Sequence, residues 1–311
     1  MTSVPSPTKT APEDPTARTA VLHACRRYRL DASGLRQIHR YNNVIYLLPR
    51  EGLIARVTGP SIPVERAVRS QQVVDWLIST HRFPATAPIT TCTPVVAAAD
   101  LTVSFWRYYP QTTVNQPTSA HLAHLLRALH SVPAPPVQLD QWVPLRSLEH
   151  ALHEPGSRIT LSASEHAWLL ERITRTRQEL ADLDWRLGIG LIHADAWAGN
   201  VLWDPARGPE RVVLADWDNV CLGPREVDLI PTWHAAARFG RDRAWVAGFA
   251  EIYGHDLSGW TGFEVLMRMR DLVQLTGPLR RAPTEPVLTR ALRQRLTAIR
   301  NHNRDAQWQA Y

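Results

Sequence analysis

Short apolar runs, bounded by glycine, proline, asparagine or aspartate, recur along the first hundred residues. Rich in β-branched and aromatic side chains, these runs predict strands and hairpins over residues 37–48, 52–57, 94–98 and 101–109. After the second run, apolar residues recur at helical spacing and Pro63 stands near a first turn, which predicts a helix over 63–79. This part of the chain is therefore predicted to form a small antiparallel sheet accompanied by one helix.

Beyond residue 115 the apolar positions follow a helical period. A helix is predicted over 119–130, with one apolar face formed by Leu122, Leu125, Leu126 and Leu129. The patterns Ser162-Ala-Ser-Glu165 and Thr261-Gly-Phe-Glu264 are typical of capping boxes and predict helices toward Asp184 and Leu275. Asp242 is predicted to cap another helix, which stops at Gly254. The second part of the chain is thus predicted to be mainly helical.

Polar residues with a chemical meaning stand where these two patterns meet. The segment His193-Ala-Asp-Ala-Trp-Ala-Gly-Asn200 is followed by Asp216-Trp-Asp218, and the apolar runs between them predict a hairpin. Such a hairpin would bring Asn200 and Asp216 together, and carboxylate and amide oxygens suit Mg²⁺. In kinases an Asp orients the attacking hydroxyl, while an Asn and a second Asp hold the metal under the phosphates. An Asp and an Asn five residues apart can also be ordinary loop capping, so the complete set carries the prediction.

These motifs resemble those of the aminoglycoside phosphotransferase and choline kinase superfamily. Its catalytic loop is His-Gly-Asp with an Asn five residues after the Asp, as in 193–202, and 214–218 and 223–229 are similar to its next two elements. The resemblance implies an α+β, protein-kinase-like two-lobe fold. The N-lobe, an antiparallel sheet plus helix that binds the nucleotide, would span 18–108. A mainly helical C-lobe for catalysis and acceptor binding would span 109–311, and 1–17 would be a disordered tail.

The resemblance also implies roles for individual residues. Asp195 would be the catalytic base, and His193 would brace its loop. Asn200 and Asp216, with Asp218 as a further candidate, would hold Mg²⁺. Asp228 would be a structural partner of the loop. Ala194 replaces the usual glycine of the family, so this loop must tolerate a methyl group where glycine normally has more backbone freedom.

The nucleotide-binding side departs further from the family, because lysine is almost absent. The single lysine is Lys9 in the tail, so Arg56 on the strand predicted over 52–57 would replace the phosphate-binding lysine. Glu65 on the following helix would be its ion-pair partner, with Gln71 or Gln72 as the alternatives. Asn43 would serve in the phosphate-covering turn, which contains no glycine. Trp106 and Tyr108 would belong to the hinge that binds the base, although aromatic residues there can also be core packing.

Composition limits the other classes of function. With 311 residues and 44% hydrophobic residues, the chain is long enough for two lobes with real cores. The prolines and polar residues of 1–17 do not form a signal peptide, and no apolar run is long enough to span a membrane. The three dispersed cysteines are expected to be reduced thiols in a cytoplasmic protein. The net positive charge suggests nucleic-acid binding as another class of function. The arginines are spread along the chain without a binding motif, however, so nucleic acid is not an expected partner.

Charge gives one inference about the acceptor. From residue 241 to the end, 11 arginines and 7 carboxylates leave a net charge of +4, which favours a neutral or anionic acceptor over a polycationic one. A local acidic pocket formed by Glu251, Asp256, Glu264 and Asp271 would reverse this expectation. The sequence therefore predicts an enzyme that transfers the γ-phosphate of ATP or GTP, with Mg²⁺, to a hydroxyl of a small molecule such as an antibiotic or metabolite. The alternatives are a kinase acting on a peptide Ser or Thr and a nucleotide-binding pseudokinase without transferase activity. Oligomeric state is left open.

Overall fold

A five-stranded antiparallel sheet forms the centre of the N-terminal part. Its strands are β1 (Arg36–Arg40), β2 (Val44–Leu48), β3 (Leu53–Thr58), β4 (Val95–Val96) and β5 (Thr102–Arg107), in the order β1-β2-β3-β5-β4. The computed structural model describes residues 13–40, 43–60, 62–111, 115–208 and 211–309. The predicted strands are thus confirmed, and the register places Ile45 beside Arg56.

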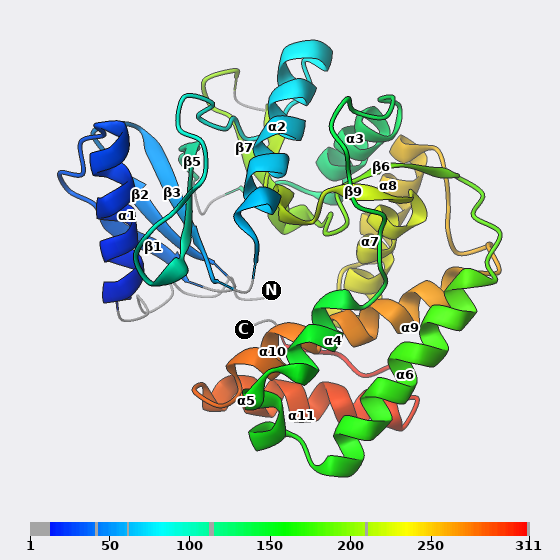
Figure 1. Ribbon diagram of the computed structural model, residues 1–311. Helices are drawn as coiled ribbons and strands as arrows, with labels where there is room; N and C mark the ends of the chain where they lie inside the picture. The colour runs from blue at the N-terminus through cyan, green and yellow to red at the C-terminus, as the bar shows by residue number, and fades with distance from the viewer. Residues whose placement is uncertain (1–12, 41–42, 61, 112–114, 209–210, 310–311) are drawn as a thin grey trace. The chain divides into compact units, whose positions relative to one another are not determined.

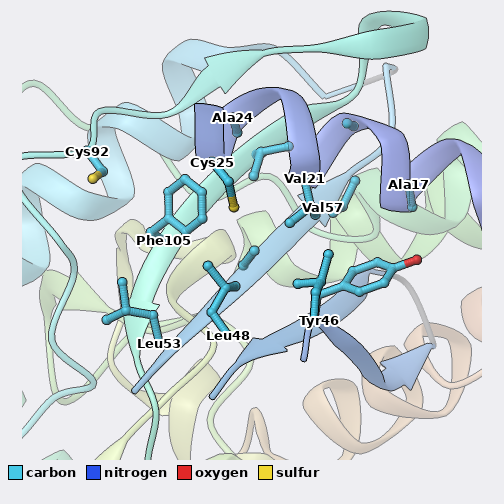
Figure 2. Close-up of a cluster of buried hydrophobic side chains, with 14 residues drawn as sticks. Ala17, Val21, Ala24, Cys25, Tyr46, Leu48, Leu53, Val57, Cys92 and Phe105 are labelled. Atoms are coloured by element: carbon cyan, nitrogen blue, oxygen red, sulfur yellow. The ribbon is translucent and has the colours of Figure 1, made fainter. Parts of the chain in front are cut away.

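Helix α1 (Pro15–Tyr28) lies along this sheet (Figure 1) and was not predicted. Asp14 caps it, accepting hydrogen bonds from the backbone nitrogens of Thr16 and Ala17, and Pro15 occupies its first position. The expectation of a tail over 1–17 is therefore wrong at its end, because residues 15–17 are helical; residues 1–12 lie outside the described part of the chain. Small buried side chains of α1 face strand residues in the core shown in Figure 2, among them Ala17, Val21, Cys25, Tyr46 and Phe105.

The helix after β3 and the hairpin before Asp216 connect the segment 216–218, which carries two aspartates, to the N-terminal part. Helix α2 (Val64–His81) confirms the helix predicted after β3, and the hairpin of β7 (Val201–Trp203) and β8 (Val212–Leu214) confirms the one predicted before Asp216. Leu214 exchanges backbone hydrogen bonds of 2.9 Å with Thr86 and Pro84, which follow α2. Short 3₁₀ turns form at η1 (Ala98–Asp100) and η3 (Trp217–Asn219).

The chain divides into two compact units. The first unit comprises residues up to Asn115 together with Pro135–Gln138 and Leu202–Asp218, and the second comprises Gln116–Ala134, Leu139–Val201 and Asn219 onward. Asp216 and Asp218 thus belong to the same unit as the five-stranded sheet, although the sequence places them in the predicted 109–311 segment. The fold is α+β and kinase-like, with a sheet-containing N-terminal unit and a mostly helical C-terminal one.

The second unit is built from helices and one small antiparallel sheet. Strands β6 (Ile189–Ile192) and β9 (Cys221–Pro224) pair with each other, and the 3₁₀ turn η2 covers Ala198–Asn200. The helices are α3 (Ser119–His130), α4 (Arg146–His153), α5 (Pro155–Thr160), α6 (Ala163–Ala181), α7 (Glu226–Phe239), α8 (Arg243–Tyr253), α9 (Phe263–Val273), α10 (Thr276–Arg281) and α11 (Pro286–Arg300).

Most of the helices and caps predicted for this unit are confirmed. Helix α3 matches its predicted bounds, the Ser162–Glu165 capping box forms at α6, and Asp242 caps α8, which ends at Gly254. The capping box predicted at Thr261 is wrong, because α9 begins after Gly262 and has no side-chain cap. Glu264, its predicted partner, pairs with Arg304 at 3.0 Å instead.

Two expectations about the whole chain can be compared with the structure. Cys25, Cys92 and Cys221 are buried and form no disulfide with one another, in agreement with the prediction of reduced thiols. Burial raises the pKa of the Cys25 thiol to about 11. Within the described residues, no helix is both long enough and apolar enough to cross a membrane.

Candidate functional site

The loop that follows β6 carries the predicted catalytic residue and is held by a buried carboxylate. Asp228, in the first turn of α7, accepts 2.7 Å hydrogen bonds from the backbone nitrogens of His193 and Ala194. His193 and Asp228 are both fully buried, and His130 Nε2 lies 3.2 Å from Asp228 Oδ2. The predicted role of Asp228 as a structural partner of the loop is confirmed, and the contact fixes the backbone immediately before Asp195.

Ala194 adopts the backbone conformation that explains the usual glycine at its position. Its φ is +61°, in the left-handed region, where a side chain costs about 1–2 kcal/mol relative to ordinary angles. The bond from its backbone nitrogen to Asp228 holds it there. The loop thus tolerates the methyl group by accepting local strain, as the substitution of alanine for glycine requires.

Asp195 and Asn200 are joined within this loop. The Asn200 side-chain nitrogen donates to the backbone oxygen of Asp195 at 2.9 Å, which leaves the amide oxygen as the atom that Asn200 can offer to a cation. The Asp195 side chain is 35% exposed, and its Oδ1 lies 3.5 Å from Nη2 of Arg270 on α9. Arg270 was not singled out in the sequence, because it lies 75 residues beyond Asp195 in an otherwise ordinary helical pattern.

The first unit brings four other predicted residues into one cluster. Arg56 on β3 donates from Nη2 to Asp216 Oδ1 and to Asp218 Oδ2, both at 2.6 Å. The Asn43 side-chain nitrogen lies 3.2 Å from the same Asp218 oxygen. Burial disfavours the charged guanidinium, but the carboxylates of Asp218 and Asp216 outweigh it and raise the pKa of Arg56 above its ordinary value. An arginine on the third strand is therefore held against the two predicted metal-binding carboxylates.

Helix α2 fixes the backbone of this acidic segment. Arg66 Nε donates to the backbone oxygen of Asp218 at 2.8 Å, and Ser70 Oγ donates to that of Trp217 at 3.1 Å. Asp216 has a φ of +66°, an uncommon conformation for a residue other than glycine. These two α2 residues were missed in the sequence, because a single Arg and Ser in an amphipathic helix give no signal of a contact about 150 residues away.

The predicted ion pair between Arg56 and Glu65 is wrong. Both ion pairs of Arg56 among the described residues go to Asp216 and Asp218, while Glu65 is exposed in the first turn of α2. One turn and a half further on, the buried Gln71 donates to the backbone oxygen of Phe105 at 3.2 Å, so it does not substitute for Glu65 either. Glu65 therefore lies too early in α2 to pair with Arg56.

The hinge candidates lie at the end of β5. Trp106 is buried and donates from Nε1 to Ser104 Oγ at 3.0 Å, whereas Tyr108 is partly exposed. The backbone nitrogens of Arg107 and Tyr108 donate to Ala87 and Gly52, both at 2.9 Å. These two donors are thus used within the unit, and the roles of Trp106 and Tyr108 in binding a base stay predictions.

The second unit holds Asp195 and Asn200, and the first holds Asp216 and Asp218. The binding of one metal ion by Asn200, Asp216 and Asp218 stays a prediction, as does the role of Asp195 as the catalytic base. The fold, the carboxylate-held Asp loop and the arginine bound to an acidic segment define the class of protein-kinase-like phosphotransferases. The sequence profile of the phosphotransferase enzyme family matches residues 34–266, and the chain belongs to this family.

Several solved structures of small-molecule kinases and phosphotransferases have a similar fold. Amicoumacin kinase hAmiN, in complex with AMP-PNP, Ca²⁺ and Ami, has a TM-score of 0.68 at 12% identity, with 94% of this chain and 97% of that chain covered. A microcompartment-associated aminopropanol kinase has a TM-score of 0.62 at 20% identity, covering 91% and 94%. The GDP complex of aminoglycoside 2'-phosphotransferase-IIIa has a TM-score of 0.60 at 11% identity, covering 92% and 99%. At these identities the similarity shows the fold. A comparison with curated protein sequences gives no match.

Proposed function

We propose that the protein transfers the γ-phosphoryl group of ATP or GTP to a hydroxyl group of a small molecule. The observation that carries the proposal is the pairing of the buried Arg56 with Asp216 and Asp218, 160 and 162 residues away in the sequence. A phosphotransferase needs a cation on this strand to bind the phosphates. It also needs carboxylates beside that cation to bind the metal. The named relatives support the same class, since the amicoumacin kinase structure holds AMP-PNP, the aminoglycoside phosphotransferase structure holds GDP, and the third is an aminopropanol kinase.

The oxygen atoms of the predicted metal ligands fit Mg²⁺. Asp216 and Asp218 offer carboxylate oxygens and Asn200 an amide oxygen, the hard donors that this ion prefers. When bound, the ion would neutralise charge on the β- and γ-phosphates. Asp195 would orient the acceptor hydroxyl and accept its proton, while the bonds from His193 and Ala194 to Asp228 hold the loop in place. Arg56, which lies beside these carboxylates, would contact the phosphates.

The test separates binding from transfer. Thermal shift with ATP or GTP, with and without Mg²⁺, and release of the nucleoside diphosphate are measured for the natural protein, Asp195→Ala and Asp216→Ala. We expect Asp195→Ala to keep the nucleotide shift and to lose about 10²- to 10⁴-fold in turnover, the usual contribution of a general base. Asp216→Ala should lose the Mg²⁺-dependent part of the shift. Glu171→Ala, which removes an exposed carboxylate from α6, is the matched control.

Two results would contradict the proposal. If the natural protein shows neither stabilisation by a nucleotide nor turnover with any hydroxyl acceptor, phosphoryl transfer is excluded as its function. If Asp216→Ala binds the metal–nucleotide complex as well as the natural protein, the metal assignment is wrong even though the fold stands.

A nucleotide-binding protein without transferase activity is the second candidate. It is favoured by the position of Arg56, whose Nη2 occupies an oxygen of each carboxylate that would hold the metal. In that case nucleotide would stabilise the protein equally with and without Mg²⁺. Asp195→Ala would then behave like the natural protein in every assay.

A further inference from the structure

Arg270 is a buried cation beside the proposed catalytic base. It lies on α9, only 9% of the residue is exposed, and its Nη2 is 3.5 Å from Asp195 Oδ1. Its Nε is buried and has no hydrogen-bond partner among the described residues. The contact with Asp195 is longer than a hydrogen bond between charged groups, which is about 2.7–2.9 Å. Among the described residues, this long ion pair with Asp195 is therefore the contact that offsets the burial of the Arg270 guanidinium.

The two carboxylates of α9, Asp271 and Glu264, are bound to residues other than Arg270. Asp271 accepts hydrogen bonds from Arg238, at 2.9 Å from Nε and 2.6 Å from Nη2, and from His234 at 3.0 Å. Glu264, on the same helix, pairs with Arg304. Two members of the acidic pocket considered from the sequence are thus bound to arginines. The local charge beside Asp195 is positive on the α9 side.

We propose that Arg270 binds an anionic group of the acceptor, such as a carboxylate, and so places the acceptor hydroxyl on Asp195. The inference rests on the proposed function and narrows its substrate class to hydroxy acids. A guanidinium binds a carboxylate with two parallel hydrogen bonds, which its two terminal nitrogens can supply. The contact of Nη2 with Asp195 is too long for a short charge-assisted hydrogen bond, so this end of Arg270 can still bind an anionic group beside Asp195.

The reaction balances with these groups alone. The acceptor hydroxyl oxygen forms a bond to the γ-phosphorus, the bond from that phosphorus to the bridging oxygen breaks, and the nucleoside diphosphate leaves. The hydroxyl proton passes to Asp195. Arg270 neutralises the acceptor's own negative charge, which would otherwise oppose its approach to the base and to the triphosphate. The net charge of +4 over residues 241–311 acts in the same direction.

The experiment uses pairs of acceptors that differ mainly in the carboxylate. Glycerate is compared with glycerol, and homoserine with 3-aminopropan-1-ol, by nucleoside diphosphate release with the natural protein, Arg270→Gln and Arg270→Lys. The control is Arg268→Gln, which removes the same charge two residues away, where Arg268 is exposed and pairs with Glu179 at 2.7 Å. We expect Arg270→Gln to lose about 10- to 100-fold in kcat/KM for the carboxylate member of each pair, as for a lost hydrogen bond to a charged group. The members without a carboxylate and the background nucleotide hydrolysis should fall by less, because they lose only the contact of Arg270 with Asp195.

Several results would overturn the inference. The natural protein could show no preference for the carboxylate acceptors, or Arg270→Gln could lower turnover of both members and background hydrolysis equally, which would assign Arg270 to the transferring phosphoryl group. Acceptor binding measured by calorimetry without nucleotide separates this inference from the proposed function. If the hydroxy acids bind the natural protein but not folded Arg270→Gln, while no nucleotide binds, the anion site stands and phosphoryl transfer fails. If no hydroxy acid binds or is phosphorylated, the anion site is wrong.

Discussion

Arg56, which is proposed to replace the phosphate-binding lysine, lies on β3 and is bound to two carboxylates. Its Nη2 atom contacts both carboxylates. Removing the guanidinium therefore leaves the negative charges of Asp216 and Asp218 close together without the positive charge that offsets their repulsion. The Arg56 side chain is only 11% exposed, so this arginine does not face solvent.

Substitution of Arg56 should make the protein depend on divalent cations for stability. We expect Arg56→Gln to lower the free energy of unfolding by about 1–3 kcal/mol, since two partly buried acceptors lose a charged donor. Mg²⁺ alone should then raise the thermal midpoint of Arg56→Gln more than that of the natural protein, because the ion replaces the missing positive charge. Arg50→Gln, at an exposed position in the turn after β2, is the control. An equal response to Mg²⁺ in all three proteins would argue against metal binding at these carboxylates.

At the scale of elements, the proposed site depends on helices that hold loops from a distance in the sequence. The first turn of α7 supplies Asp228 to the loop after β6, and α2 supplies Arg66 and Ser70 to the segment after β8. In both cases the bonds go to backbone atoms. The loop shape is thus fixed independently of the side chains that are proposed to do the chemistry.

The α7 contact can be tested by an isosteric change. In Asp228→Asn one of the two acceptor oxygens becomes an NH₂ group. That group cannot accept a hydrogen bond, so the side chain loses one of its two bonds from the backbone nitrogens of His193 and Ala194. We expect a loss of about 2–3 kcal/mol in the free energy of unfolding and a fall in kcat with little change in nucleotide binding. Denaturant unfolding and steady-state kinetics measure the two effects. Asp182→Asn, at the C-terminal end of α6, is the control, and a natural kcat in Asp228→Asn would show that the loop does not need this carboxylate.

At the scale of the whole molecule, a buried network in the second unit makes stability depend on pH. Burial lowers the pKa of His234 to about 4, although the bond to Asp271 partly offsets it. In the unfolded chain this histidine takes up a proton near its ordinary pKa of about 6.5. The unfolded state therefore binds more protons between these two values, and stability falls as the pH falls through that window.

The expected size of this effect is about 3 kcal/mol between pH 7 and pH 4, from a shift of about 2.5 pKa units. Chemical denaturation at several pH values measures it. His234→Gln, which keeps a donor for Asp271 and does not titrate, should lose most of this part of the pH dependence. His150→Gln, on an exposed surface of α4, should keep it. If the two variants show the same pH profile, the acid sensitivity lies elsewhere.

Much of the fold and part of the proposed site could be predicted from the amino-acid sequence. Local signals sufficed for α3, for the caps of α6 and α8 and for the hairpin before Asp216, because periodicity and capping act over a few residues. Helix α1 was missed because alanines form most of its buried face and give little contrast with its arginines. The loop motif also led to Asp228. The roles of Arg66, Ser70 and Arg270 could not be predicted, because each depends on a contact between distant segments that leaves no local pattern.

The membership of residues 202–218 in the first unit has a consequence for how the chain is made. Translation delivers Arg56 to the ribosome exit well before its carboxylate partners, which lie 160 and 162 residues further on. At about 5–20 residues per second, this gap lasts roughly 8–32 s. The sheet can be synthesised in full during that time, while the acidic segment that completes the unit has not yet been translated. A nascent chain stalled before residue 216 should therefore be more sensitive to protease in this unit than one released at full length.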